Sequence, residues 1–526
     1  MIPAREATGQ PWNADAGTRT ATLMSRTARG FSPFPAISPL PGIPAIAGLK
    51  PNRNLTMHRS FTGGKAAAAG TAALLASLFL APDAQAAQAG PTNGATDGGT
   101  FEFTEYHLDN GLHVILAPDP GSTAVAVNLW YNAGSRHEPP GRSGFAHLFE
   151  HLMFQGSENV ARGEHFQFVE RAGGNLNASI TQDRTNYFQT VPPERMNLAL
   201  WLESDRMRSL SVTEENMARE VDVVIEERRQ VVDNSPYGTS NLQAAFYAAY
   251  DSASCFAYAH SVIGSVEDLR AAELEDVQRF FDTYYAPNNA TLTVVGAFDE
   301  AVARELIQEY FGGIPRGTEP AEVMCEEPFS HLPVEMEVFD GNAQLEAVWI
   351  SYGAVERRHP DAAALNVLAQ ILGSGESSRL HQRLVRQEQA ALQSAALSNL
   401  RLGPGLIQLI GIANQGVEAE RLLELLDEEV DRIVADGVTD QELERARNQV
   451  RAGTILGRQT VMGRAEALQT ANHFYGSPQA VHTTVERVEA VTAEDVRRVA
   501  STYLTRDNRA VIFTRPGTGQ NQEDDR

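Results

Sequence analysis

Residues 143–159 read SGFAHLFEHLMFQGSEN and place two histidines and a glutamate within five positions, in the order H-x-x-E-H. On an α-helix, His147 and His151 share one face and lie one turn apart, with Glu150 beside them. Two imidazoles at this spacing can bind one zinc ion and leave the carboxylate free to act on a water molecule. The ordinary alternative for such residues is a solvated polar face on a helix.

A zinc ion needs a third protein ligand, and residues 211–238 offer one. The stretch SVTEENMAREVDVVIEERRQVVDNSPYG has apolar residues at helical spacing, which predicts an amphipathic helix. Glu220 and Glu227 are seven positions apart, which is two turns along one face. A surface charge cluster at 226–229 is the alternative interpretation.

The H-x-x-E-H order is also a known metallopeptidase signature. With Glu227 placed 76 positions after His151, the pattern resembles the pitrilysin/insulinase family of zinc metallopeptidases. The similarity extends over about 101–515 and includes LDNGLHVILAPDP (108–120), GGNLNASITQDRTNYFQTVP (173–192), HSVIGSVEDL (260–269), YYAPNNATLTVVGAFD (284–299) and LGSGESSRLHQRLVRQEQ (372–389).

The resemblance implies a zinc metalloendopeptidase that hydrolyses peptides or unfolded protein segments, with one Zn²⁺ per chain. His147, His151 and Glu227 would bind the metal, and Glu150 would be the general base. Glu220 would orient one of the ligands. Some relatives of this family are catalytically inactive subunits with a structural role, and such a subunit is the alternative. A purely structural zinc site is a third option, although it would not require a free carboxylate between the histidines.

The resemblance also implies where a peptide substrate would bind. An extended peptide would add to an edge strand around 177–180 through backbone hydrogen bonds, so Asn177 and Ala178 are expected to contact it. Phe154 would line a side-chain pocket, or it is a core aromatic residue. Mitochondrial processing relatives carry acidic residues at the positions of Tyr237 and Asn241, so removal of targeting presequences is not supported.

The second half of the chain is expected to repeat the first without its metal site. Aligning LGSG with FQGS sets Asn366, Ala369 and Gln370 opposite His147, Glu150 and His151. The predicted fold is α+β, with two similar lobes that each contain an antiparallel-rich sheet packed with helices. The expected organisation is a zinc-bearing catalytic lobe at 101–311, a linker at 312–331, a second lobe at 332–515 and a disordered tail at 516–526.

The second half also lacks one expected catalytic group. The resemblance implies that active members use an arginine and a tyrosine, seven positions apart in a lobe without zinc, to hold the substrate and its oxyanion. Arg386 matches the arginine, but Gln393 occupies the tyrosine position. We therefore expect a heterodimer with a related zinc-less subunit that supplies the Arg/Tyr pair. A homodimer is the alternative.

Composition and the N-terminal region place the protein outside the cytoplasm. The net charge of −24 argues against nucleic acid as a partner. Residues 57–86 have the basic start, apolar stretch and A-x-A ending of a signal peptide, and 1–56 form an upstream extension that is disordered or not translated. The apolar stretch is too short for a stable membrane anchor, so a periplasmic or secreted bacterial protein is predicted. An oxidising compartment would permit a disulfide between Cys255 and Cys325, but the sequence does not show whether they meet, and two buried, unpaired cysteines are the default expectation.

Overall fold

The computed structural model describes residues 101–517. The predicted extension at 1–56, the signal peptide at 57–86 and residues 518–526 of the predicted tail lie outside the described residues. The first residue of that tail, Pro516, belongs to the last strand.

The first lobe contains a six-stranded sheet with the order β1-β2-β6-β3-β5-β4. Only the β2–β6 pair is parallel in this sheet. The strands are β1 Thr104–His107, β2 His113–Pro118, β3 Val125–Tyr131, β4 Asn175–Ile180, β5 Thr185–Val191 and β6 Ala290–Gly296. The helices are α1 Phe145–Leu152, α2 Glu164–Arg171, α3 Met196–Ser209, α4 Glu214–Arg228, α5 Gly238–Leu242, α6 Val266–Arg270, α7 Leu274–Tyr284 and α8 Glu300–Phe311.

The second lobe contains a five-stranded sheet with the order β7-β11-β8-β10-β9. Only the β7–β11 pair is parallel here. The strands are β7 Val334–Asp340, β8 Ala347–Ala354, β9 Ala391–Asn399, β10 Gly405–Ala413 and β11 Arg509–Pro516. The helices are α9 Ala362–Gly373, α10 Ala419–Asp436, α11 Asp440–Gly457, α12 Val461–Tyr475, α13 Thr484–Glu489 and α14 Ala493–Tyr503. The predicted α+β class with two similar lobes is confirmed.

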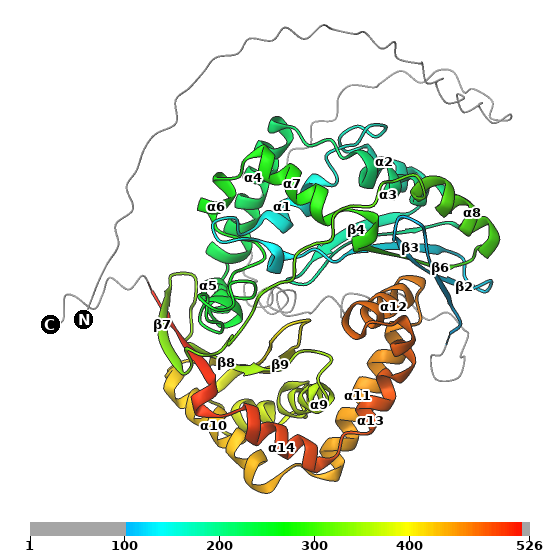
Figure 1. Cartoon of the computed structure of the whole chain (residues 1–526). Coiled ribbons are helices and arrows are strands. Elements are labelled where there is room, and N and C mark those ends of the chain that lie inside the picture. The colour runs from blue at the N-terminus through cyan, green and yellow to red at the C-terminus, as the bar shows by residue number, and fades with distance from the viewer. Residues whose placement is uncertain (1–100, 518–526) are drawn as a thin grey trace, which may run out of the picture. The chain divides into compact units, whose positions relative to one another are not determined.

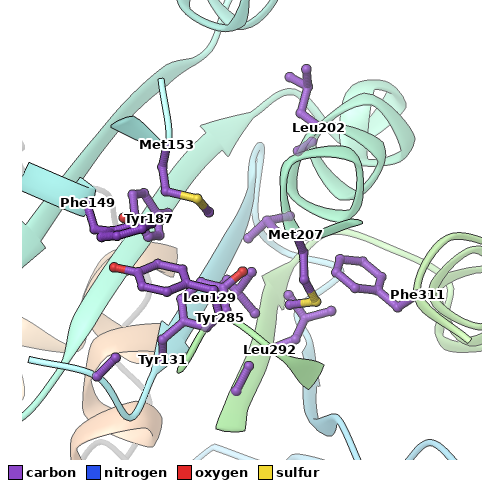
Figure 2. Packing of buried hydrophobic residues seen from close by; sticks show 14 of the residues in the cluster. Leu129, Tyr131, Phe149, Met153, Tyr187, Leu202, Met207, Tyr285, Leu292 and Phe311 are labelled. Atoms are coloured by element: carbon purple, nitrogen blue, oxygen red, sulfur yellow. The ribbon is translucent and has the colours of Figure 1, made fainter. Parts of the chain in front are cut away.

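The core of the first lobe lies between its sheet and the helices above it (Figure 1). Figure 2 shows how side chains from strands and helices meet there. The labelled residues are Leu129, Tyr131, Phe149, Met153, Tyr187, Leu202, Met207, Tyr285, Leu292 and Phe311. Every residue of β3 is buried, because helices cover both faces of the sheet. Its apolar sequence VAVNLWY fits a strand without a solvent face.

Each lobe contributes a helical segment that packs against the sheet of the other lobe. Helix α12, from the second half of the chain, packs on the outer face of the first sheet, where Ala465 and Leu468 join a cluster with Ile115 and Val295. In return, the segment of α5 and the π-helical turn Gln243–Tyr247 places Ala244 in a cluster on the second sheet. Both exchanges bury apolar area that would otherwise face water, and this links the two lobes.

The two cysteines form a disulfide, so the prediction of two unpaired cysteines is wrong. Cys255 and Cys325 are 70 residues apart, and no spacing in the sequence indicates that they meet. They meet because the segment 312–331 runs back beside residues 249–259. Backbone hydrogen bonds join Asp251 to Pro328 (2.8 Å) and Glu326 to Ser254 (3.2 Å).

Candidate metal centre

The three predicted ligands converge between α1 and α4. The ligand atoms of His147, His151 and Glu227 all lie within 4.8 Å of one another. Glu227 Oε2 is 3.3 Å from His151 Nε2 and 3.6 Å from His147 Nε2. A tetrahedral zinc site with bonds of about 2.0–2.1 Å has ligand–ligand edges of about 3.3–3.4 Å. Two imidazole nitrogens and one carboxylate oxygen at these separations fit a zinc ion with an open fourth position.

Glu220 lies beside the ligand set without belonging to it. Its side chain is buried on α4, and its Oε2 is 3.4 Å from His151 Nδ1, the ring nitrogen that faces away from Glu227. A carboxylate at this place holds a histidine ring in one orientation and leaves the other nitrogen for a metal. His147 has no comparable partner, because its Nδ1 is buried without a hydrogen bond among the described residues.

The two histidines of the site differ in their pKa values. Burial lowers the pKa of His147 to about 4, which keeps this imidazole neutral and able to bind a metal. Burial alone would lower the pKa of His151, but the hydrogen bonds to Glu220 and Glu227 raise it to about 9. Zinc binding at His151 therefore has to release a proton.

Glu150 is the remaining carboxylate at this site. It is half-buried on α1, and burial raises its pKa to about 7, against the opposing effect of His151. A carboxylate with such a pKa can take up a proton and release it near neutral pH.

The start of α1 is fixed by a buried carboxylate that the sequence analysis missed. Glu138 accepts backbone hydrogen bonds from Gly144 (2.9 Å) and Ala146 (2.6 Å). These N–H groups have no partner within the helix, and a negative charge there is favoured by the helix dipole. Gly144 itself is in the left-handed conformation, with φ of 91°. Glu138 lies outside the H-x-x-E-H motif, so only its contacts in the structure reveal its role.

The predicted substrate strand is present next to α1. Strand β4 is the outermost strand of the first sheet and pairs only with β5 among the described strands. It packs against α1, which carries both histidines. Asn177 is exposed and Ala178 is half-buried. No described strand pairs with the other edge of β4, where the backbone N–H of Ala178 donates to the side-chain oxygen of Asn177 (2.9 Å).

The other predicted substrate residues lie in different surroundings. Phe154 is half-buried and packs against Phe166 and the buried Arg206, with ring centroids 4.8 Å apart in the first pair. These contacts join it to the core of the first lobe. Arg386 is exposed in a π-helical turn and forms an ion pair with Glu376 (2.9 Å) in its own lobe. Within the described part of the chain, the structure does not bring Arg386 to the three predicted ligands.

The comparisons with known proteins agree with the fold. The sequence model described as Insulinase (Peptidase family M16) matches residues 113–257, and the model described as Peptidase M16 inactive domain matches 271–450. The chain belongs to the insulinase family of peptidases, family M16.

Individual relatives carry the same description. The zinc protease PqqE of Helicobacter pylori is 29% identical over 416 residues, which is 78% of this chain and 92% of that protein. A zinc protease of Bacillus subtilis, YmxG, is 23% identical, over 78% of this chain and 98% of the relative. The crystal structure of a protease from Helicobacter pylori matches with a TM-score of 0.75 and 27% identity, over 79% of this chain and all of that chain.

One feature bears on the membrane. Between residues 101 and 517, none of the helices combines the length and the apolar character that crossing a bilayer requires.

Proposed function

We propose that this protein is a zinc-dependent endopeptidase in which Glu150 is the general base. The observation that carries the proposal is the convergence of His147, His151 and Glu227, whose ligand atoms lie within 4.8 Å of one another, with Glu150 one helical position from His151. The names of the relatives support the same activity.

The roles of the residues follow from their positions. When bound, zinc would lower the pKa of a coordinated water and polarise the scissile carbonyl. Glu150 would accept a proton from the attacking water and donate it to the leaving amine. A peptide binds along the free edge of β4 through backbone hydrogen bonds, which tolerates many side chains and places the chain next to α1.

A substitution at Glu150 tests this proposal. Glu150→Gln keeps the size of the side chain but cannot take a proton, so the variant should bind zinc like the wild type and lose hydrolysis of a peptide library by at least about 100-fold. Metal content is measured on the same preparation. Near-wild-type turnover in the zinc-loaded variant would remove Glu150 from the mechanism.

A non-catalytic structural subunit is the second candidate. It is favoured by the inactive-domain description of residues 271–450 and by the second lobe itself. There α9 carries Asn366, Ala369 and Gln370, which cannot form a histidine–carboxylate metal site. Zinc-loaded protein that hydrolyses no peptide, alone or with its partner, would favour this candidate.

We also propose that a zinc-less relative completes the active enzyme. Gln393 lies in β9, and the arginine expected to act with a tyrosine there is occupied by Glu376. The purified chain should be weakly active alone and gain activity on addition of that relative. Full activity of an isolated homodimer, unchanged by Gln393→Tyr, would contradict the heterodimer.

Export to the periplasm or the medium is part of the proposal. It is supported by the Cys255–Cys325 disulfide, because such bonds persist in oxidising compartments and are rare in the cytoplasm. The signal peptide predicted at 57–86 points to the same compartment.

A further inference from the structure

Residues 255–264, here called the anchor loop, contact three parts of the candidate site. The loop begins at the disulfide, where Cys255 is buried and bonded to Cys325. From there it continues into the stretch HSVIGS (260–265), to which the sequence analysis assigned no function. No residue of the loop is a proposed ligand, base or substrate contact.

The first contact reaches the start of α1. His260 donates from Nδ1 to the carbonyl of Phe256 (2.7 Å) and from Nε2 to the Glu138 carboxylate (2.9 Å) and the Ser135 carbonyl (2.9 Å). Carbonyl oxygens only accept, so both ring nitrogens carry protons and His260 is an imidazolium paired with Glu138. Both side chains are almost fully buried, at 3% and 0% exposed. Glu138 in turn holds the N-terminus of α1, which carries His147 and His151.

The second contact reaches the end of α4. The carbonyl of Gly264 accepts a hydrogen bond from Arg228 (2.7 Å), the neighbour of Glu227. Gly264 also lies directly on the backbone of Gly144, the residue that precedes α1. One loop residue thus touches both helices that supply the proposed ligands.

The third contact reaches the turn between β4 and β5. The Tyr258 hydroxyl donates to Asp183 Oδ1 (2.7 Å) in this turn and accepts from the backbone N–H of Gly403 (2.9 Å). The other carboxylate oxygen of Asp183 accepts from Leu402 (3.0 Å). The bond from Tyr258 therefore fixes the end of the proposed substrate strand.

We propose that the anchor loop is the common support that sets the metal-binding helices and the substrate strand relative to one another, and that His260 and Tyr258 are positioning residues for the reaction. The disulfide fixes the loop at its base. The inference rests on the proposed function, because His260 and Tyr258 can position groups for a reaction only if the protein is the proposed peptidase. The contacts themselves do not depend on it.

Tyr258→Phe tests the strand side of the support. It removes the hydroxyl that donates to the Asp183 carboxylate. The variant should speed amide hydrogen exchange in 175–180 and raise KM for an extended peptide by about 10-fold, with kcat and zinc affinity within about twofold, because hydrogen bonds to charged groups are stronger than average. Tyr250→Phe is the matched control. Tyr250 stacks on Tyr258 with ring centroids 5.9 Å apart, but its hydroxyl donates to Pro404 and not to the turn.

His260→Gln tests the helix side. It should speed exchange in 145–152 and weaken zinc binding about 10-fold, measured by competition with a zinc-binding dye, because groups that orient a ligand typically change metal affinity by about 10- to 100-fold. The matched control is His331→Gln, a half-buried histidine that also bonds a backbone carbonyl, that of Ala248 (2.9 Å). The double variant Cys255→Ala/Cys325→Ala, which releases the base of the loop, should change both regions together.

The readouts separate the possible failures. If the loop variants only lower the unfolding temperature, with exchange, KM and zinc affinity equal to those of their controls, the loop is merely structural and the proposal is overturned. If the wild type neither binds zinc nor hydrolyses peptide, the proposed function fails. The exchange data on α1 and β4 still decide whether the loop positions them.

Discussion

A Cβ atom on Gly264 would lie 2.4 Å from the Cα of Gly144, so these two glycines bring the backbones of the anchor loop and the start of α1 into direct contact. They are 120 positions apart in the sequence. A side chain on Gly264 would require one of the two backbones to move, whereas a Cβ atom on Gly144 would lie 3.0 Å from the Cα of Gly264, which is a tight contact.

Gly264→Ala should therefore lower the free energy of unfolding by about 2–5 kcal/mol, since a clash in a packed region adds to the cost of a left-handed φ. Urea unfolding measures the loss. Gly375→Ala is the control, because Gly375 has nearly the same φ (75°, against 74°) with no atom within 4 Å of the new Cβ. Equal losses in the two variants would mean that the contact with Gly144 adds nothing.

Glu220 and Glu227, both on α4, should differ in their effect on zinc. Glu220→Gln removes an orienting group and should weaken zinc binding by about 10- to 100-fold. Glu227→Gln removes a proposed ligand and should weaken it more. Metal analysis after dialysis ranks the variants, with Glu226→Gln, an exposed neighbour, as the control. The reverse order would place the third ligand at Glu220.

The acid stability of the second lobe should depend on Glu442. Burial would raise the pKa of this carboxyl, but hydrogen bonds from Arg379 (2.7 and 2.9 Å) and Thr439 (2.8 and 2.9 Å) lower it to about 2. A folded pKa below the unfolded one stabilises the protein above about pH 4.5, and the gain is lost as the pH falls toward about 2.

Glu442→Gln should therefore cost about 1–3 kcal/mol of unfolding free energy at neutral pH, and the difference from wild type should shrink between about pH 5 and pH 3. Urea unfolding at several pH values checks this. Glu444→Gln, an exposed residue of the same helix, is the control. A difference that stays constant with pH would show that the charge of Glu442 is not involved.

The exported protein should begin near Ala87, because Ala84-Gln85-Ala86 is the best cleavage site in the N-terminal region. Intact-mass measurement on protein from the native cell envelope or medium gives the N-terminus directly. A cytoplasmic product that retains residues 57–86 would contradict the proposed export.

The proximity of His147, Glu150 and His151 was predictable from sequence because their spacing is local, whereas Glu227, 76 positions after His151, was assigned from the resemblance, and the tertiary structure brings it beside the two histidines. The i and i+4 spacing of His147 and His151 puts both rings on one helical face whatever the helix packs against. The distance between Glu220 and Glu227 likewise keeps them on one side of α4. The α+β class was predictable for the same reason, since strand alternation and helical periodicity are short-range patterns.

The tertiary structure alone decided which distant segments meet. The Cys255–Cys325 bond, the contact of Gly264 with Gly144 and the pair of His260 with Glu138 all join residues whose spacing carries no periodic signal. The sequence likewise gives no sign that α12 packs on the first sheet and that the segment containing α5 packs on the second. Local patterns determine what each segment becomes, whereas the burial of apolar faces and buried polar groups in one common core determines where it lies.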